Sequence, residues 1–334
     1  MAIVRKKARL LYLLDILRKK TDEDHPMSAA ELIGKLAANG IAAERKTIYD
    51  DIALLGDLGY DIVHSKGKKA GYFLGERRFE FPELKMFADA VQSAKFITPK
   101  KTRELIKKIQ ALMSENQANA LKQQLFLANR YKTQNEEIYY NIDKITRAIE
   151  KKKKVCFLYC EYTPDKKMRY RKNGALYHVS PYALSWFEDA YYLVGNMAKF
   201  DNLAHFRVDR VSKVGITGEP VRPVEEVSEF KNYLDPAEYQ KELFHMIGGE
   251  RLTVRIRFKN HLATTVFDKF GLSARVIETD GETFTVSVPV RASGGFLSWI
   301  MLFGKDAEIL SPKRIREDIL KLSEGIFGIY REKT

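Results

Sequence analysis

The stretch AYYLVGNMAKFDNLAHFRVDRV, residues 190–211, decides how the middle of the chain is expected to fold. Its first part, AYYLVGN, is aromatic and apolar throughout, which predicts a buried strand. In its last part, HFRVDRV, the side chains of His205, Arg207 and Asp209 alternate with apolar ones. Successive side chains of a strand point to opposite faces, so the alternation predicts a strand with an apolar face and a charged one.

The segments before this stretch have the same character. A helical pattern runs from about Glu136 to Lys152, and the strand-like segments KVCFLYCEY, MRYRKN and LYHVSPYALSWF follow it. The segment LAHFRVDRVSKVGIT continues the series as one further strand. Short strands at this spacing predict a small, strongly bent sheet or barrel, which we place at residues 136–220.

The N-terminal segment, residues 1–78, predicts three helices and a hairpin. Leucines recur at helical spacing in ARLLYLLDILRK, and Ser28 opens a capping box that Glu31 closes. The third helix is ERKTIYDDIALLGDLG, and the strands YDIVHS and AGYFLG follow it, joined by the basic SKGKKAG. Three helices followed by a basic hairpin are the arrangement of a winged helix-turn-helix.

The third helix and the hairpin carry the residues that would contact DNA. The apolar stripe of the helix packs inward, which leaves a set of hydrogen-bond donors facing outward near its N-terminus. A recognition helix uses such donors for base edges and phosphates, and hairpin lysines would release counterions along the DNA backbone. Each feature alone also fits a solvated surface, but their order favours DNA binding. The candidate residues are Arg45, Lys46, Thr47, Tyr49, Lys66, Lys68 and Lys69.

The remaining segments complete a multidomain α+β organisation. Residues 79–135 show helical patterns broken at Pro99 and near Ser114, which predicts a helical connector that can form part of a dimer surface. Residues 221–250 predict a helical linker. In residues 251–334, strands alternate with helices as in a compact α+β sandwich of the ferredoxin-like kind.

Positive charge is concentrated in the middle domain. The chain has a formal net charge of +13, and residues 151–172 contain nine Lys or Arg against Glu161 and Asp165. Together with nearby tyrosines and histidines, these cations predict a surface for a nucleotide or a single strand, whose bases stack and whose phosphates pair with guanidinium groups. The alternative is that Asp209 pairs with Arg207 or Arg210 and holds a turn.

Three motifs resemble one family of regulators. SPYAL, then Tyr191-Tyr192-Leu193, then HFRVDRV resemble the WYL domain, an Sm-like barrel named for a Trp-Tyr-Leu triplet in which this chain has Tyr in place of Trp. ERKTIYDDIALLGDLGYDI resembles the helix-turn-helix of DeoR-like and WYL-domain regulators. LFGKDAEILSPKRIREDI resembles the WCX-type extension that commonly follows WYL domains.

The resemblance implies a basic pocket that binds a nucleotide or a single-stranded nucleic acid as effector. On the matching positions, the implied effector-binding residues are Tyr192, Arg207, Arg210, His178, Ser180 and His205. His205 stands where the family often has Arg, which implies a different effector or a pH response near neutrality. Asp50 replaces a basic residue of many relatives, whereas Asp51 is in the family's usual place and is expected to be structural.

No catalytic or metal-binding motif accompanies these features. The sequence lacks GxSxG, P-loop, dinucleotide-binding and HExxH patterns, so we expect neither an enzyme nor a cofactor. Cys156 and Cys160 have no second pair to complete a metal site. No apolar run reaches the length of a membrane span, and the N-terminus is read as an amphipathic helix rather than a signal peptide, which predicts a cytoplasmic protein.

The sequence therefore predicts a homodimeric transcriptional regulator. Its winged helix would bind double-stranded operator DNA, and its middle domain would bind a phosphate-bearing effector. The alternative is an accessory protein of a larger complex, such as a defence system, whose main activity is binding RNA or single-stranded DNA.

Overall fold

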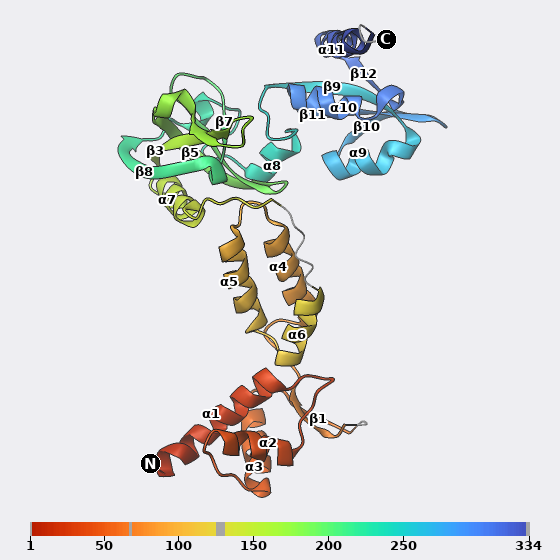
Figure 1. Cartoon of the computed structure of the whole chain (residues 1–334). Helices are drawn as coiled ribbons and strands as arrows, with labels where there is room; N and C mark the ends of the chain where they lie inside the picture. Colours follow the sequence, from red (N-terminus) through yellow and green to blue (C-terminus); the bar gives the residue numbers. More distant parts are fainter. Residues whose placement is uncertain (1, 67–68, 125–130, 332–334) are drawn as a thin grey trace. The chain divides into compact units, whose positions relative to one another are not determined.

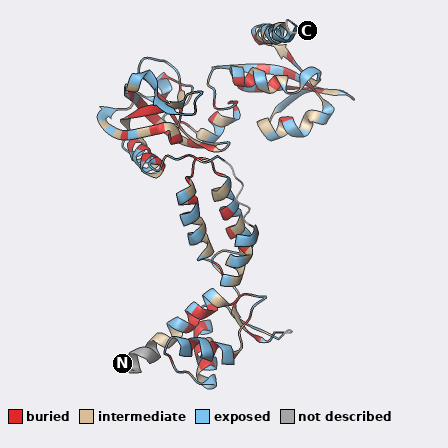
Figure 2. Cartoon of the chain, in the orientation of Figure 1, coloured by how far each residue is buried: buried red, intermediate tan, exposed pale blue. Residues whose placement is uncertain are grey.

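A computed structural model describes residues 2–66, 69–124 and 131–331 of the chain (Figure 1). The chain forms two compact units, residues 1–134 and residues 135–334, and each is described by itself. Figure 2 shows the buried residues of each unit lying on the inner sides of its helices and strands.

The first unit begins with three helices and a two-stranded hairpin. Their bounds are α1 Ala2–Lys20, α2 Ala29–Ala38, α3 Arg45–Asp57, β1 Ile62–Ser65 and β2 Gly71–Leu74. The three helices bury one leucine-rich core, in which Leu13, Leu17 and Leu32 are completely buried. The predicted capping box is present, because the Ser28 hydroxyl accepts from the Glu31 N–H and the Glu31 carboxylate accepts from the Ser28 N–H.

The predicted helical connector consists of three helices. They are α4 Phe81–Ser93, α5 Pro99–Gln110 and α6 Glu115–Gln124. Thr98 caps α5 by accepting a hydrogen bond from the Lys101 N–H, with Pro99 in the first turn. Leu84 and Leu121 are buried between the helices.

The second unit starts with a helix and a curled sheet. The elements are α7 Ile138–Glu150, β3 Lys153–Tyr162, β4 Met168–Tyr170, β5 Tyr177–Phe187, β6 Ala190–Asn196, β7 Ala204–Arg207 and β8 Val211–Pro220. The antiparallel strands follow the order β4-β3-β5-β6-β7, and β8 pairs with β3, which curls the sheet into a half-barrel (Figure 1). An aromatic core fills it: the Phe157 ring stacks on Tyr177 with centroids 5.8 Å apart, and the Phe206 ring lies 5.2 Å from Phe157.

The predicted continuous strand through HFRVDRV is wrong. β7 ends at Arg207, a 3-10 turn spans Val208–Arg210, and β8 begins at Val211. The side chain of Asp209 is buried in this turn and forms an ion pair with Arg207, 2.8 Å between Nη2 and Oδ2. The Asn135 amide holds the turn, because it donates to the carbonyls of Asp209 and Val211. The chain therefore adopts the turn that the sequence left open as an alternative.

The linker is much less helical than expected. Within residues 221–250 the structure has a 3-10 turn at Val224–Glu226 and one short helix, α8 Pro236–Lys241. The apolar side chains of the linker, among them Val227, Tyr239 and Leu243, pack against the curled sheet instead of forming a helical face of their own. Tertiary burial has overridden the local helical pattern.

The C-terminal part is a sheet with helices on it. Its elements are β9 Glu250–Lys259, α9 Ala263–Phe270, β10 Arg275–Thr279, β11 Thr283–Ala292, α10 Gly294–Met301, β12 Ala307–Ser311 and α11 Lys313–Arg331. The antiparallel strand order is β10-β11-β9-β12. Alternate residues of β9 and β11, such as Val254, Phe258 and Val286, are buried in a core that includes α9 and α10. None of the described helices is both long and apolar enough to cross a membrane.

Candidate functional site

The exposed face of α3 gathers the donors that the sequence predicts for DNA. Arg45, Lys46 and Tyr49 are exposed, and Thr47 is half-buried. Arg45 Nε donates to the Tyr49 hydroxyl at 2.8 Å, and the guanidinium carbon lies 5.9 Å from the centroid of that ring. These two residues are one helical turn apart, so the pair holds both side chains along the helix surface.

An aromatic row continues from α3 onto the hairpin. The centroid of the Tyr49 ring lies 6.2 Å from that of Tyr72 on β2, and Tyr72 lies 4.7 Å from His64, its cross-strand partner on β1. Sequence reasoning missed Tyr72 and His64, although the alternation along the two short strands could have placed them on one face. Lys66 and Lys69 are exposed in the hairpin loop, and Lys68 lies outside the described residues.

The start of α3 has no side-chain cap. The helix begins at Arg45 with Glu44 as N-cap, one residue later than the expected start at Glu44, and the Glu44 side chain makes no capping hydrogen bond. No acidic residue lies in the first turn. The first backbone N–H groups of the helix therefore have no side-chain acceptor within the described chain, and the exposed Glu44 carboxylate is the one acidic group at this end.

The aspartate that was expected to be structural is anchored inside the unit. The Asp51 carboxylate accepts from Arg9 on α1, with Nε–Oδ2 at 2.6 Å and Nη2–Oδ1 at 3.0 Å. This hydrogen bond raises the pKa of Arg9 above its ordinary value. Asp50, by contrast, is exposed on the helix surface.

In the curled sheet, the structure brings Tyr192, Arg207 and Arg210 together. Tyr192 and Arg207 are directly opposite each other on β6 and β7. The charge of Arg210 acts on the phenols of both Tyr159 and Tyr192, although burial, the larger cause, raises the pKa of each. The Arg207 N–H donates to the Tyr159 hydroxyl at 3.1 Å, so Tyr159 joins this group. Sequence reasoning missed Tyr159, which the period-two pattern of β3 could have placed beside Phe157.

The two arginines of this group differ in their partners. The Arg207 guanidinium donates twice to Asp209, at 3.1 and 2.8 Å, and this hydrogen bonding raises the pKa of Arg207. Arg210 is half-buried, and no carboxylate among the described residues forms an ion pair with it. Arg210 is thus the cation of this group whose charge is not already neutralised by a neighbour.

The other three predicted effector residues lie elsewhere. His205 packs against the linker, with Nε2 3.1 Å from the Tyr239 hydroxyl, and burial, together with the charge of Arg291, lowers its pKa to about 4. A pKa this low disfavours a pH response of His205 near neutrality and leaves a different effector as the other expectation for this position. Ser180 is 2% exposed and accepts from the Arg222 N–H, which ties the linker to β5. His178 is exposed on β5, opposite Cys156 on β3.

A partly buried network of charged side chains joins the linker beside His205 to the C-terminal sheet. The Arg291 guanidinium lies 5.2 Å from the centroid of Tyr239 and forms ion pairs with Glu229 and Glu242. Arg251 also pairs with Glu242, at 2.7 Å. The linker is thus held on one side by the curled sheet and on the other by β9 and β11, an arrangement that the sequence did not predict.

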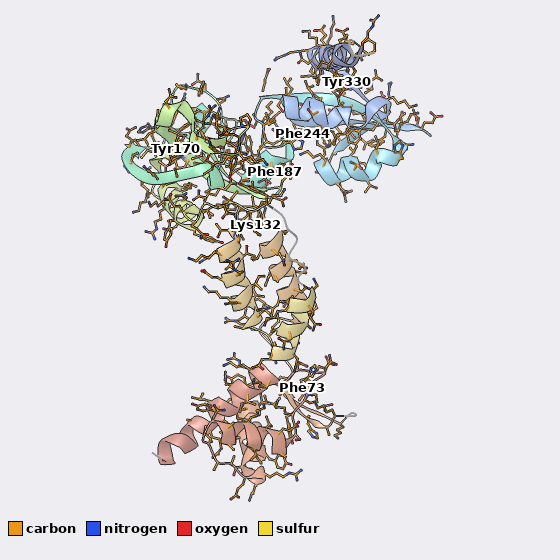
Figure 3. All side chains as sticks on the ribbon, in the orientation of Figure 1. Phe73, Lys132, Tyr170, Phe187, Phe244 and Tyr330 are labelled. Carbon is orange, nitrogen blue, oxygen red and sulfur yellow. The ribbon has the colours of Figure 1, made fainter. Side chains whose placement is uncertain are left out.

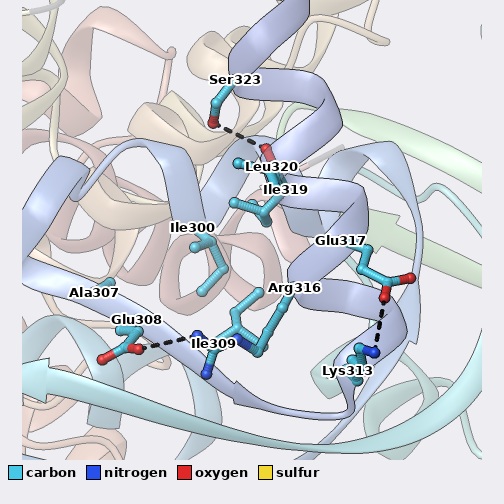
Figure 4. Close-up of a pocket in the computed structure, with 10 residues that line it drawn as sticks. All are labelled: Ile300, Ala307, Glu308, Ile309, Lys313, Arg316, Glu317, Ile319, Leu320 and Ser323. Atoms are coloured by element: carbon cyan, nitrogen blue, oxygen red, sulfur yellow. Dashed lines mark hydrogen bonds and ion pairs between the residues drawn. The ribbon is translucent and has the colours of Figure 1, made fainter.

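Two cavities of the second unit lie apart from the Arg207 group. One of about 440 Å³ is lined by Lys152, Tyr182 and Arg222 with neighbouring linker residues. Another, of about 420 Å³, lies in the C-terminal domain between α11, β12 and α10 (Figure 4). Neither contains Tyr192, Arg207 or Arg210. In the part of the chain that the structure describes, no group of three or more His, Cys, Asp or Glu residues is arranged to hold a metal ion.

Comparison with known protein families identifies two of the domains. Residues 140–216 match the WYL domain, and residues 250–326 match the WCX domain. The chain therefore contains a WYL domain, which includes the Tyr192, Arg207 and Arg210 group, followed by a WCX domain.

Two solved structures are similar to the chain at low sequence identity. Proteasome accessory factor B/C (PafBC) of Arthrobacter aurescens is 16% identical with a TM-score of 0.27; the match covers 95% of this chain and 46% of that one. A structure described as a CRISPR Cas-related protein is 15% identical with a TM-score of 0.35, over 99% of this chain and 86% of that one. The chain thus spans less than half the length of the PafBC chain. No curated protein sequence matches it.

Proposed function

We propose that the protein is a DNA-binding transcriptional regulator whose WYL domain senses a nucleotide or a single-stranded nucleic acid. In this proposal residues 1–78 form a winged helix-turn-helix that binds operator duplex, and the chain acts as a homodimer without catalytic activity. The curled sheet is assigned as an Sm-like barrel. The C-terminal domain is assigned as ferredoxin-like, which the β10-β11-β9-β12 order supports.

The surface of α3 is the observation that carries the proposal. Arg45, Lys46 and Tyr49 are exposed beside an uncapped helix start, and the Tyr49, Tyr72 and His64 rings lead to the lysines of the hairpin. Donors near the N-terminus of such a helix suit base edges and phosphates in a major groove, and hairpin lysines suit the flanking backbone. Duplex DNA uses both parts of this surface at once.

The Arg207 and Arg210 group supports the effector part of the proposal. A guanidinium binds phosphate through charge-assisted, often bidentate hydrogen bonds. Arg210 supplies a positive charge with no paired carboxylate among the described residues, and Arg207 is held in a fixed orientation by Asp209. The half-buried Tyr192 ring beside them offers a surface on which a base can stack.

The linker offers a way for effector binding to reach the rest of the dimer. β7 carries both Arg207 and His205, and His205 contacts Tyr239, which packs on Arg291 of β11. An effector that binds one arrangement of the contacts among Arg207, His205, Tyr239 and Arg291 more tightly would shift the population of protein molecules toward that arrangement. A differential affinity of a few kcal/mol is enough to change the affinity for DNA.

Fluorescence anisotropy on full-length protein tests the DNA part. The probe is a labelled duplex from the gene's own upstream region, measured at fixed physiological salt against random duplex. We expect Lys46→Ala combined with Tyr49→Ala to abolish the preference for the upstream duplex. Tyr12→Ala is the matched control, because this α1 tyrosine is 43% exposed and Tyr49 is 39% exposed. Equal binding of both duplexes by the wild type would contradict the proposal.

The same assay tests the effector part. Addition of a short single-stranded oligonucleotide or a nucleotide is expected to change the duplex affinity, and Arg210→Ala is expected to remove that response.

The second candidate is an accessory protein that binds single-stranded nucleic acid. The cation-rich segment at residues 151–172 favours it, since Lys167, Arg169 and Arg171 are strongly exposed on and beside the β3–β4 hairpin. Tight single-strand binding that survives the α3 substitutions, with no preference for the upstream duplex, would select this candidate.

A further inference from the structure

The proposed winged helix-turn-helix is joined to the connector by one short segment of chain. β2 ends at Leu74, just after Phe73, and α4 begins at Phe81 (Figure 3). Both parts lie in the first compact unit, but the leucine-rich core of the N-terminal helices and the core of the connector share no residue. A single covalent connection between parts with separate cores permits relative motion unless other contacts fix their orientation.

The buried carboxylate of Asp22 makes such a contact. Asp22 follows α1 and is 4% exposed, and its Oδ2 accepts a hydrogen bond from the hydroxyl of Ser114, which is completely buried just before α6 (Figure 1). Nδ1 of His25 lies 2.6 Å from Oδ1 of the same carboxylate. Burial by itself would raise the pKa of Asp22, but the hydrogen bonds from Ser114 and His25 outweigh burial and hold the pKa below its ordinary value. The carboxylate is therefore buried in its charged form and depends on these donors.

Ser114 transmits this contact directly to helix α6. Its hydroxyl oxygen also accepts from the Gln117 N–H at 3.0 Å, and its own N–H donates to the Gln117 side chain at 3.2 Å. This reciprocal arrangement is a capping box, which fixes the first turn of a helix. The Asp22 carboxylate is thus bound to the end of a helix and not to a side chain on a mobile surface.

Further contacts of the last turn of α1 act in the same direction. Arg77, in the segment between β2 and α4, donates to the carbonyls of Arg18 at 2.9 Å and Thr21 at 2.6 Å. Lys20 forms an ion pair with Glu115 in the first turn of α6. The end of α1 is therefore held both by the connecting segment and by the connector. These contacts form the joint, which consists of Lys20, Thr21, Asp22, Arg77, Ser114 and Glu115.

The packing beside the joint is incomplete. A cavity of about 520 Å³ lies between Tyr60 at the end of the helix-turn-helix and Leu112 and Met113 of the connector. Apolar packing therefore does not close this side, and the orientation of the two parts depends on the polar contacts of the joint. Removal of the partner of a buried charge costs more than removal of an exposed ion pair, so the Asp22–Ser114 contact is the one that the joint can least lose.

We propose that Asp22 is a positioning residue that sets which spacing of operator half-sites the dimer recognises. The inference rests on the proposed homodimeric regulator and adds a determinant of its specificity outside α3. The two recognition helices of a dimer must reach half-sites that lie one DNA turn, about 34 Å, or a multiple of it apart. A fixed joint holds each α3 in one orientation relative to its connector, so one spacing fits. A loosened joint lets each α3 follow a half-site that has been shifted.

Fluorescence anisotropy on full-length protein measures this property. The probes are the footprinted upstream site, the same site with its centre lengthened by half a helical turn, about five base pairs, and a duplex with a single half-site. We expect the wild type to bind the lengthened site at least about tenfold more weakly than the original one. In Asp22→Ala this ratio is expected to fall below about threefold, while the affinity for the single half-site stays unchanged.

Three further variants separate the contact from its surroundings. Ser114→Ala removes the same hydrogen bond from the connector side and is expected to give the same loss of spacing preference. Asp22→Asn keeps an acceptor for the Ser114 hydroxyl, so it is expected to retain most of the preference. Asp24→Ala is the matched control, because Asp24 is an exposed aspartate of the same loop, and we expect it to leave both the ratio and the half-site affinity unchanged.

The possible outcomes distinguish this inference from the function on which it rests. A wild type without any spacing preference would overturn the proposed dimeric regulator and this inference with it. A preference that Asp22→Ala and Ser114→Ala both keep would overturn this inference and leave the regulator standing. If Asp22→Ala alone loses half-site binding, Ser114→Ala decides. Loss of half-site binding in both variants would show that the joint maintains the fold and not the orientation, and would also overturn the inference.

Discussion

The ion pair between Arg207 and Asp209 distinguishes two arginines that the effector proposal treats alike. Arg207→Ala removes both hydrogen bonds to a carboxylate whose side chain is 8% exposed. Arg210→Ala removes a cation with no paired carboxylate among the described residues. We therefore expect both variants to lose effector binding, but only Arg207→Ala to lose stability.

The size of the effect follows from the contact. A hydrogen bond to a charged group contributes about 1.5–3 kcal/mol, and breaking a fully buried ion pair costs about 3–5 kcal/mol. The Arg207 side chain is 28% exposed, so water can replace part of what Asp209 loses. We expect a loss of about 2 kcal/mol in the free energy of unfolding. For a unit of this size, that corresponds to a fall in Tm of roughly 4–8 °C.

Tryptophan fluorescence isolates the unit concerned. The two tryptophans, Trp186 and Trp299, both lie in residues 135–334, so their thermal transition reports this unit alone. Effector affinity is measured separately by anisotropy. The double variant Arg207→Ala with Asp209→Ala is expected to recover part of the lost Tm, because no carboxylate is then buried without its cation. Equal Tm losses in Arg207→Ala and Arg210→Ala would refute the reasoning.

Three further predictions follow from other contacts. His205 has a folded pKa of about 4, below its unfolded value. The free energy of unfolding should therefore fall by about 2 kcal/mol between pH 7 and pH 5, because the unfolded state takes up a proton over this range. His205→Gln should flatten this decline in tryptophan-monitored urea titrations. Asp51→Asn should loosen α3 from α1, which lowers duplex affinity and speeds amide hydrogen exchange in α3; unchanged exchange would count against it. Gly195→Ala should cost about 1–3 kcal/mol, because its Cβ would lie 2.6 Å from the Ser180 carbonyl oxygen, whereas Gly218→Ala, with nothing within 4 Å, should leave the Tm unchanged.

The elements of the fold were largely predictable from local patterns. The Ser28 capping box, the Pro99 helix start and the apolar runs of β3 and β6 depend on residues a few positions apart, so the sequence alone indicates them. The linker was predicted poorly, because its apolar residues resemble a helical stripe but are buried against the sheet. A local pattern does not show which surface a side chain will cover.

The candidate sites were predictable only in part. Tyr192, Arg207 and Arg210 meet as expected, because adjacent strands place them opposite one another or at the next turn. His205 and Ser180 came from the same short motifs but face the linker, where they contact Tyr239 and the Arg222 N–H. The His205 and Tyr239 side chains are 34 positions apart in the sequence, and Ser180 and Arg222 are 42 apart, so no pattern among neighbouring residues predicts these contacts.

The sequence by itself determined the order of helices and strands, the placement of charge and the presence of donors on α3, because these depend on composition and on neighbours within one or two turns. Only the tertiary structure decided which of those groups are available to a ligand. It paired Arg207 with Asp209 in a turn held by Asn135, packed His205 against Tyr239, and tied Asp51 to Arg9. The physical reason is that burial and ion pairing are settled between segments distant in the chain, where the gain from a buried contact outweighs local preference.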